Sequence, residues 1–146
     1  LKDLDLAYAP PYSSAKDPVN MAGFMIENLS HGLVEQFFPE DVDALPRDGS
    51  VTLLDTRTAE EYQSGHIEGT IHIPVDELRE RMNELETGKL VYVICQSGLR
   101  SYIACRILEQ NGFACRNLAG GYRLYESVML DRCAAEEAFP CGMDKR

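Results

Sequence analysis

Two short, mostly apolar segments constrain the fold more than any other feature of this sequence. They are VTLLD at 51–55 and LVYVIC at 90–95, and both are rich in the β-branched and aromatic residues that favour strands. Continuous apolar strands are typical of parallel sheets, because such sheets are covered on both faces. Between about residues 33 and 130, further short apolar runs alternate with amphipathic stretches, so the pattern predicts an α/β domain.

Weaker patterns predict the remaining elements. Three shorter apolar runs are strand candidates, at 33–38, 69–73 and 114–118. Amphipathic stretches predict helices at 58–63, 75–85, 101–111 and 122–130. Gly112 follows the stretch at 101–111, and glycine is a typical residue at the end of a helix. Nearer the N-terminus, residues 19–29 allow a short helix with Asp17 as its N-cap and Pro18 at its first position.

The composition is that of a soluble globular protein, and 146 residues suit a single core. Fourteen Lys and Arg against 24 Asp and Glu give a net charge of −10, which argues against general binding to nucleic acid or anionic membranes. No apolar run approaches the roughly 18 residues that span a bilayer, and no signal peptide is evident, so we expect a cytoplasmic protein. Five cysteines without a CxxC pair predict free thiols and no metal site.

The first 29 residues differ from the rest of the chain. They hold three of the seven prolines and show little periodicity before Pro18, which predicts an arm outside the core. The sequence begins at Leu1 rather than Met, so we expect it to be part of something longer. Residues 33–130 form the predicted main domain, and 131–146 stay an unassigned tail.

The loop after the second strand carries the strongest chemical signal. Cys95 stands at the end of that strand, the small residues Ser97 and Gly98 follow, and a predicted helix comes next. Backbone N–H groups in such a loop, at the positive end of a helix, can bind an anion. Gly98 permits a turn with positive φ, and Arg100 adds a positive charge. We therefore expect Cys95 to be a reactive thiolate.

Charge and cysteine burial bear on this prediction in opposite directions. Residues 87–125 contain five Lys and Arg but one Glu, a local charge of +4 that predicts attraction of anions. Free cysteine is among the most buried residue types, however, so the spacing alone leaves a purely structural Cys95 open. We expect Cys95 to be alkylated faster than the other cysteines. Those four are predicted to have no chemical role: Cys105, Cys115, Cys133 and Cys141.

Three segments of the chain together resemble a single rhodanese domain, which would cover residues 33–130. They occur in the expected order and read LLDTRTAEEYQSGHIEGTIHIPVDEL, VYVICQSGLRSYIACRILEQNGF and NLAGGYRLYE. The resemblance implies a five-stranded parallel sheet with helices on both faces. It also implies transfer of sulfane sulfur through a persulfide on Cys95.

The resemblance also implies roles for single residues. Cys95 would carry the sulfur, and Arg100 is the second predicted catalytic residue. The residues expected to surround the bound donor are Gln96, Ser97, Gly98, Leu99 and Ser101. Three others match strand-end and GHI positions and are expected to brace the rim of the site rather than transfer protons: Asp55, Arg57 and His66. Gly120 and Gly121 match the turn before the last helix, where we expect a backbone requirement only.

The first 29 residues resemble a different family. LDLAYAPPYSSAKDPVNMAGF is similar to the end of the dimerisation domain in flavin-dependent pyridine nucleotide-disulfide reductases of the CoA-disulfide reductase type. Tyr8 matches a tyrosine that reaches the partner subunit's active site in those enzymes, but here we expect Tyr8 and Tyr12 only to pack within the arm. The resemblance implies a longer protein in which a reductase domain using FAD and NAD(P)H is fused to this sulfur carrier. No cofactor is expected on the present residues.

The predicted function is therefore sulfur transfer from a donor to a thiol acceptor. Thiosulfate, polysulfide and low-molecular-weight persulfides such as CoA persulfide are the candidate donors. Two alternatives stay open: a non-catalytic rhodanese-like binding or regulatory module, and a cysteine-dependent phosphatase. The phosphatase is disfavoured because four residues separate Cys95 from Arg100, whereas phosphatases of this fold have five. The smaller ring suits a sulfur atom better than a phosphoryl group.

Overall fold

The computed structural model describes residues 17–137 and divides the chain into two units, residues 1–35 and 36–146. The first unit contains helix α1 (Pro18–Ser30). The N–H of Val19 donates to Asp17 Oδ1 over 2.9 Å, and Pro18 occupies the first turn, so the predicted helix and its cap are confirmed. Six of its apolar side chains are exposed: Val19, Met21, Phe24, Met25, Ile26 and Leu29. The predictions for Tyr8 and Tyr12 lie outside the described residues.

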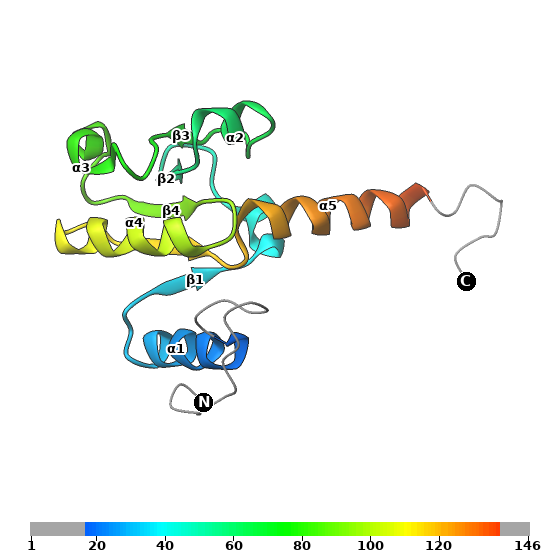
Figure 1. The fold of residues 1–146 in the computed structure, drawn as a ribbon. Coiled ribbons are helices and arrows are strands. Elements are labelled where there is room, and N and C mark those ends of the chain that lie inside the picture. The colour runs from blue at the N-terminus through cyan, green and yellow to red at the C-terminus, as the bar shows by residue number, and fades with distance from the viewer. Residues whose placement is uncertain (1–16, 138–146) are drawn as a thin grey trace. The chain divides into compact units, whose positions relative to one another are not determined.

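A five-stranded sheet forms the centre of the second unit (Figure 1). Its strands are β1 (Glu35–Phe37), β2 (Val51–Asp55), β3 (Ile71–His72), β4 (Leu90–Ile94) and β5 (Cys115–Leu118). They lie in the order β1-β5-β4-β2-β3, and β2 pairs in parallel with both β3 and β4, as β4 does with β5. The predicted parallel α/β sheet is confirmed, although the outer strands are shorter than their apolar runs suggested.

Helices cover both faces of this sheet. Successive side chains of each strand point to opposite sides, so the apolar strands present side chains that must be buried on both faces. On one face Leu54 and Val93 pack with Ala104 and Leu108 of helix α4 (Leu99–Gln110). The short helix α3 (Leu78–Arg81) and the 3₁₀ segment η2 (Met82–Glu84) cover the same face.

The opposite face forms a second buried cluster. Leu53 and Ile94 pack there with Val42 of the 3₁₀ segment η1 (Pro39–Ala44), and Tyr122 and Tyr125 of helix α5 (Gly121–Glu137) pack against the cluster. The remaining helix, α2 (Ala59–Gln63), follows β2. The prediction of helices on both faces is therefore confirmed.

Three predicted helices differ in extent from those observed. The prediction of one helix over 75–85 is wrong, because α3 spans only four residues and the chain continues as the 3₁₀ turn η2. Apolar residues spaced i, i+3 fit a 3₁₀ helix as well as an α-helix, so the pattern could not distinguish the two. Helix α4 begins at Leu99, two residues early, because Gly98 makes the turn itself. Helix α5 runs to Glu137, seven residues beyond its predicted end, since residues 131–137 contain neither Gly nor Pro.

No helix within residues 17–137 combines the length and the apolar character that crossing a membrane requires.

Deletion of residues 1–29 should leave the second unit folded, because both buried clusters of the sheet lie within residues 36–137. We expect the free energy of unfolding of that unit to change by less than about 1 kcal/mol, the size of effect usual for changes outside a core. Urea unfolding of the full chain and of residues 30–146, followed by circular dichroism, measures the difference. A truncated chain that loses its cooperative transition would show that the arm belongs to the core.

Candidate active site

The site lies where β2 and β4 end side by side. Asp55, the last residue of β2, pairs in register with Ile94, the last residue of β4. The loops that follow the two strands therefore start at the same edge of the sheet, and Thr56 strengthens this junction because its N–H and its hydroxyl both donate to the Ile94 carbonyl. The carboxyl edge of a parallel sheet is the usual place for a ligand site.

The cysteine loop curls around its own sulfur. Gly98 adopts the predicted positive φ, +100°, and it also forms the N-cap of α4. The Gly98 N–H and the Ser101 hydroxyl both donate to Cys95 Sγ over 3.1 Å. Sγ therefore lies at the N-terminal end of a 12-residue helix, whose dipole favours negative charge there.

The other predicted loop residues are more peripheral. Ser97 and Leu99 are exposed, and Gln96 is half-buried. Cys95 itself is fully buried, with 0% of its surface exposed.

Helix α5 holds the loop from behind. The backbone N–H of Tyr122 donates to the Cys95 carbonyl over 2.7 Å, and that of Arg123 donates to the Gln96 carbonyl over 3.1 Å. Gly121 makes this approach possible: it has a φ of +67°, and a Cβ at this position would lie 2.6 Å from the Cys95 oxygen and from the Ser97 nitrogen. The backbone requirement predicted for Gly121 is thus seen directly.

A buried asparagine supports the loop from β5, and sequence reasoning missed it. Asn117 Nδ2 donates to the Gly98 carbonyl over 3.2 Å, and the Ser101 hydroxyl oxygen lies 3.2 Å from the same carbonyl, which is the alternative acceptor to Cys95 Sγ for its single proton. Asn117 Oδ1 is buried without a hydrogen-bond partner. The sequence could have indicated a role for Asn117 only through the pairing of β4 with β5. That pairing places Asn117 beside Val93, two residues before Cys95.

Asp55 and Arg57 form a buried ion pair, with 0% and 1% of their side chains exposed. Arg57 Nε and Nη2 donate to the Asp55 carboxylate at 2.8–3.0 Å. The remaining donors of Arg57 reach Gln96 Oε1 at 3.3 Å and the Gly65 carbonyl at 2.7 Å, and its guanidinium lies 4.0 Å from the centre of the Tyr122 ring. Arg57 thus ties Asp55 to the loop, and the bracing role that the resemblance implies for both residues stays a prediction.

His66 is exposed, and its described contacts are with Tyr62. Its Nδ1 lies 3.1 Å from the Tyr62 carbonyl, and its ring stacks on the Tyr62 ring at 4.0 Å. His72 stacks on the same tyrosine ring at 4.3 Å, and His72 Nε2 lies 2.8 Å from the Arg57 carbonyl. The three rings brace the segment between β2 and β3, which fits a structural role for His66.

Arg100 is held by Glu61, a residue that sequence reasoning also missed. Arg100 Nη1 and Nη2 donate to the two carboxylate oxygens of Glu61, each over 2.7 Å. Glu61 completes a capping box at the start of α2, where its carboxylate accepts the Thr58 N–H. The spacing Thr58-x-x-Glu61 was a signal for the cap, but not for the ion pair. The hydrogen bonds from Arg100 lower the pKa of Glu61 to about 2.

The local charge of +4 predicted for residues 87–125 is an overestimate. At least three of its five cations form ion pairs: Lys89 with Glu86, Arg100 with Glu61, and Arg106 with Glu109. Two of these carboxylates, Glu61 and Glu86, lie outside the counted segment. A count along the sequence cannot include partners that folding brings in.

The other cysteines differ in their surroundings. Cys105 and Cys115 are buried as predicted, and the hydrogen bond with Cys115 together with burial raises the pKa of Cys105. Cys133 is exposed on α5, so the order in which Cys95 and Cys133 are alkylated stays a prediction. Cys141 lies outside the described residues.

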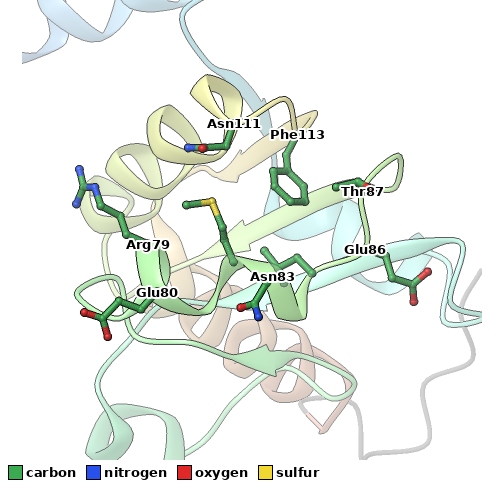
Figure 2. Close-up of a pocket in the computed structure, with 9 residues that line it drawn as sticks. Arg79, Glu80, Asn83, Glu86, Thr87, Asn111 and Phe113 are labelled. Carbon is green, nitrogen blue, oxygen red and sulfur yellow. The ribbon is translucent and has the colours of Figure 1, made fainter.

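A pocket of about 760 Å³ lies at the opposite ends of the strands, before β4 and β5 (Figure 2). Residues of α3 and η2 line it, together with Asn111 at the end of α4 and Phe113 ahead of β5. None of the predicted site residues lines this pocket. Within residues 17–137, His, Cys, Asp and Glu form no cluster of three that could hold a metal ion.

Replacing Gly121 by Ala should disturb the loop more than replacing another glycine of positive φ. Gly112 has a φ of +84°, and a Cβ added there would have no atom within 4 Å, so Gly112→Ala adds only backbone strain, about 1 kcal/mol. Gly121→Ala adds overlap with the Cys95 loop, and we expect a further loss of about 1–3 kcal/mol. Urea unfolding of both variants measures the difference, and equal losses would contradict the close approach.

Acid should remove the stabilisation that Glu61 provides. Its pKa is about 2 in the folded protein, below the ordinary value of 4.5, so the ionised carboxylate stabilises the fold above about pH 4.5. That contribution is lost as the pH falls from 4.5 towards 2. We expect the stability difference between the wild type and Glu61→Gln to shrink over this range in denaturant unfolding. A difference that stays constant from pH 6 to pH 3 would show that the carboxylate charge contributes nothing.

Three comparisons with known proteins bear on the identity of this site. The "Putative sulfur carrier protein YrkF" of Bacillus subtilis is 43% identical over 76 residues, which are 52% of this chain and 40% of that protein. The crystal structure of reduced CoADR-RHD from Bacillus anthracis has a TM-score of 0.84 and 44% identity, covering 90% of this chain and 24% of that chain. A NAD-dependent persulfide reductase from A. fulgidus has a TM-score of 0.70 and 41% identity, covering 84% and 21%. The chain spans less than half the length of each.

The family model for the rhodanese-like domain matches residues 38–127, which include the sheet from β2 onward and the whole cysteine loop. This match covers more than half of the 146 residues. The chain belongs to the rhodanese-like domain family of sulfurtransferases.

Proposed function

We propose that this chain is a sulfurtransferase in which Cys95 carries sulfane sulfur as a persulfide. One observation carries the proposal: Cys95 Sγ accepts two hydrogen bonds at the N-terminal end of α4, from Gly98 N–H and from the Ser101 hydroxyl. Both donors stabilise a thiolate, and the thiolate is the nucleophile in sulfur exchange.

The reaction has two exchange steps, and neither needs a redox cofactor. In the first, the Cys95 thiolate attacks a sulfane sulfur of the donor, the S–S bond of the donor breaks, and a thiolate or sulfite leaves. In the second, an acceptor thiolate attacks the outer sulfur of the Cys95 persulfide and regenerates the Cys95 thiolate. Because Cys95 is fully buried, each step requires the atoms that cover Sγ to move aside.

The roles of the surrounding residues follow from their contacts. Gly98 and Ser101 stabilise negative charge on sulfur, while Gln96 is fixed by Arg57 at the rim of the site. Ser97 and Leu99, which are exposed on the loop, are the residues placed to meet a donor. Arg100 contributes a positive charge beside the loop, although its guanidinium is bound to Glu61.

We also propose that this chain belongs to a longer protein, in which a reductase is fused to the sulfur carrier. Support comes from the CoADR-RHD structure and the persulfide reductase structure, both of which match more than four fifths of this chain. In such a protein FAD and NAD(P)H belong to the reductase part, and the two parts exchange a low-molecular-weight persulfide such as CoA persulfide. The acceptor is a thiol, and a cytoplasmic location fits free thiols.

Replacing Cys95 by Ser should abolish sulfur loading. We expect the wild type to gain one sulfur atom after incubation with a donor, whereas Cys95→Ser gains none. Intact-mass spectrometry measures the gain, and peptide mapping places the sulfur. Cys133→Ser is the matched control, because Cys133 is exposed and far along α5, and it should load like the wild type. Loading of Cys95→Ser would contradict the mechanism, and a wild type that never loads would favour a binding module.

A further inference from the structure

The Ser101 hydroxyl has one proton and two acceptors within reach. Its oxygen lies 3.1 Å from Cys95 Sγ and 3.2 Å from the Gly98 carbonyl oxygen. A hydroxyl donates its single proton to one strong acceptor at a time, so the two acceptors compete for it. A serine within a helix commonly donates to the carbonyl three or four residues before it, which for Ser101 includes Gly98. The outcome of this competition decides whether Cys95 Sγ keeps its second hydrogen-bond donor.

Two other donors already bind the Gly98 carbonyl. The backbone N–H of Tyr102 donates to it over 3.1 Å, in the first turn of α4, and Asn117 Nδ2 donates to it over 3.2 Å from β5. A carbonyl oxygen has two lone pairs, and these two N–H donors fill them. The Ser101 proton is then left to Cys95 Sγ.

The fold brings Ser101 and Asn117 together from two elements. Ser101 lies on the inward side of α4, where it is fully buried one turn before Ala104 and Cys105. Asn117, with 5% of its surface exposed, follows Cys115 by two residues in β5 and so faces the same side of the sheet. Both are polar side chains at the border of an apolar cluster, at its end next to Cys95.

The amide of Asn117 serves the loop rather than the stability of the core. Its Oδ1 is buried without a hydrogen-bond partner among the described residues. A buried acceptor without a donor lowers the stability of the fold, so an apolar side chain of similar size would suit this position better. The reversed orientation would place Oδ1 against the Gly98 oxygen, and two acceptors repel one another. The amide is therefore oriented by its hydrogen bond to Gly98.

We propose that Asn117 is a positioning residue, which occupies the Gly98 carbonyl and thereby directs the Ser101 hydroxyl to Cys95 Sγ. The inference rests on the proposed sulfurtransferase function and deepens it, because sulfur needs this donor in both exchange steps. In the first step the donor favours the Cys95 thiolate that attacks the sulfane sulfur. In the second it stabilises the same thiolate as it leaves, when the acceptor takes the outer sulfur.

The test replaces Asn117 by Leu, which has nearly the same size and cannot donate a hydrogen bond. Alkylation of Cys95 by iodoacetamide is followed across the pH range by peptide mapping. We expect the midpoint of its pH profile to rise by about one pH unit, so that alkylation below both midpoints slows about tenfold. Asn117→Ala removes the same amide with less bulk and should shift the midpoint equally. Circular dichroism verifies both folds.

The same substitution at the other end of α4 is the matched control. Asn111, which is exposed, also donates its side-chain amide to a helix carbonyl, that of Ile107 over 2.8 Å. Asn111→Leu therefore removes a similar hydrogen bond far from Cys95, and its midpoint should stay within about 0.3 pH unit of the wild type. An equal shift in Asn111→Leu would overturn the proposal.

A double-mutant cycle shows whether the effect passes through Ser101. In a Ser101→Ala background no hydroxyl is left to direct, so Asn117→Leu should move the midpoint by less than about 0.3 pH unit. A role of Asn117 in the shape of the loop alone would shift the midpoint equally with and without Ser101. That result, or an unchanged midpoint in Asn117→Leu, would overturn the proposal.

The charged groups around Cys95 are the same in all these variants, so they do not produce the shift. They are the ion pairs of Asp55 with Arg57 and of Glu61 with Arg100, and the exposed Arg123 at the start of α5. The Cys105 thiol on α4 stays neutral, because its hydrogen bond with Cys115 and its burial raise its pKa.

Sulfur loading separates this inference from the proposed function. With thiosulfate as donor, Asn117→Leu should load about tenfold more slowly than the wild type below both midpoints, and within about threefold of it above them. A loading rate that stays tenfold lower at high pH would contradict the positioning role. A wild type whose alkylation midpoint shifts as expected in Asn117→Leu, but which loads from neither thiosulfate nor a persulfide, contradicts only the sulfurtransferase function.

Discussion

The buried ion pair between Asp55 and Arg57 is the interaction on which the site depends most. Its two charges lie at the end of β2 with almost no exposed surface, and Arg57 reaches three other segments: the loop through Gln96, the segment after α2 through Gly65, and α5 through the Tyr122 ring. Removing one partner of such a pair leaves an uncompensated buried charge and typically costs about 3–5 kcal/mol. The pair therefore fixes the relative positions of the segments that surround Cys95.

The N-terminal ends of helices α4 and α5 both contact the cysteine loop, but they contact different atoms of it. Helix α4 begins directly after Gly98 and directs its positive end at Cys95 Sγ, which favours a thiolate. Helix α5 uses its first amides, those of Tyr122 and Arg123, to hold the carbonyls of Cys95 and Gln96. One helix end thus serves the chemistry, and the other fixes the backbone that performs it. In the proposed sulfur transfer, this division would keep the backbone in place while Cys95 gains and loses a sulfur atom.

Much of the fold followed from the sequence for a physical reason. A strand buried on both faces is mostly apolar, as VTLLD and LVYVI are, so β2 and β4 were predicted to the residue or within one. Edge strands are less buried and need not be apolar, so their bounds are harder to predict. The edge strand β3 spans only two of its five predicted residues. The predicted turn at Gly98 and the cap at Asp17 also hold, because both depend on local geometry alone.

The charges of the site could not be predicted in the same way, because they depend on pairs far apart in the sequence. Glu61 and Arg100 are separated by 39 residues, and only the parallel register of β2 with β4 brings the elements that follow these strands together. A count of nearby basic residues suggested a site open to anions, whereas the folded chain pairs Arg57 and Arg100 with carboxylates. The stabilisation of sulfur therefore comes mainly from hydrogen bonds and a helix end rather than from free positive charge. Directed N–H and O–H donors act over short distances, so they can stabilise one negative charge on a sulfur atom without attracting anions in general.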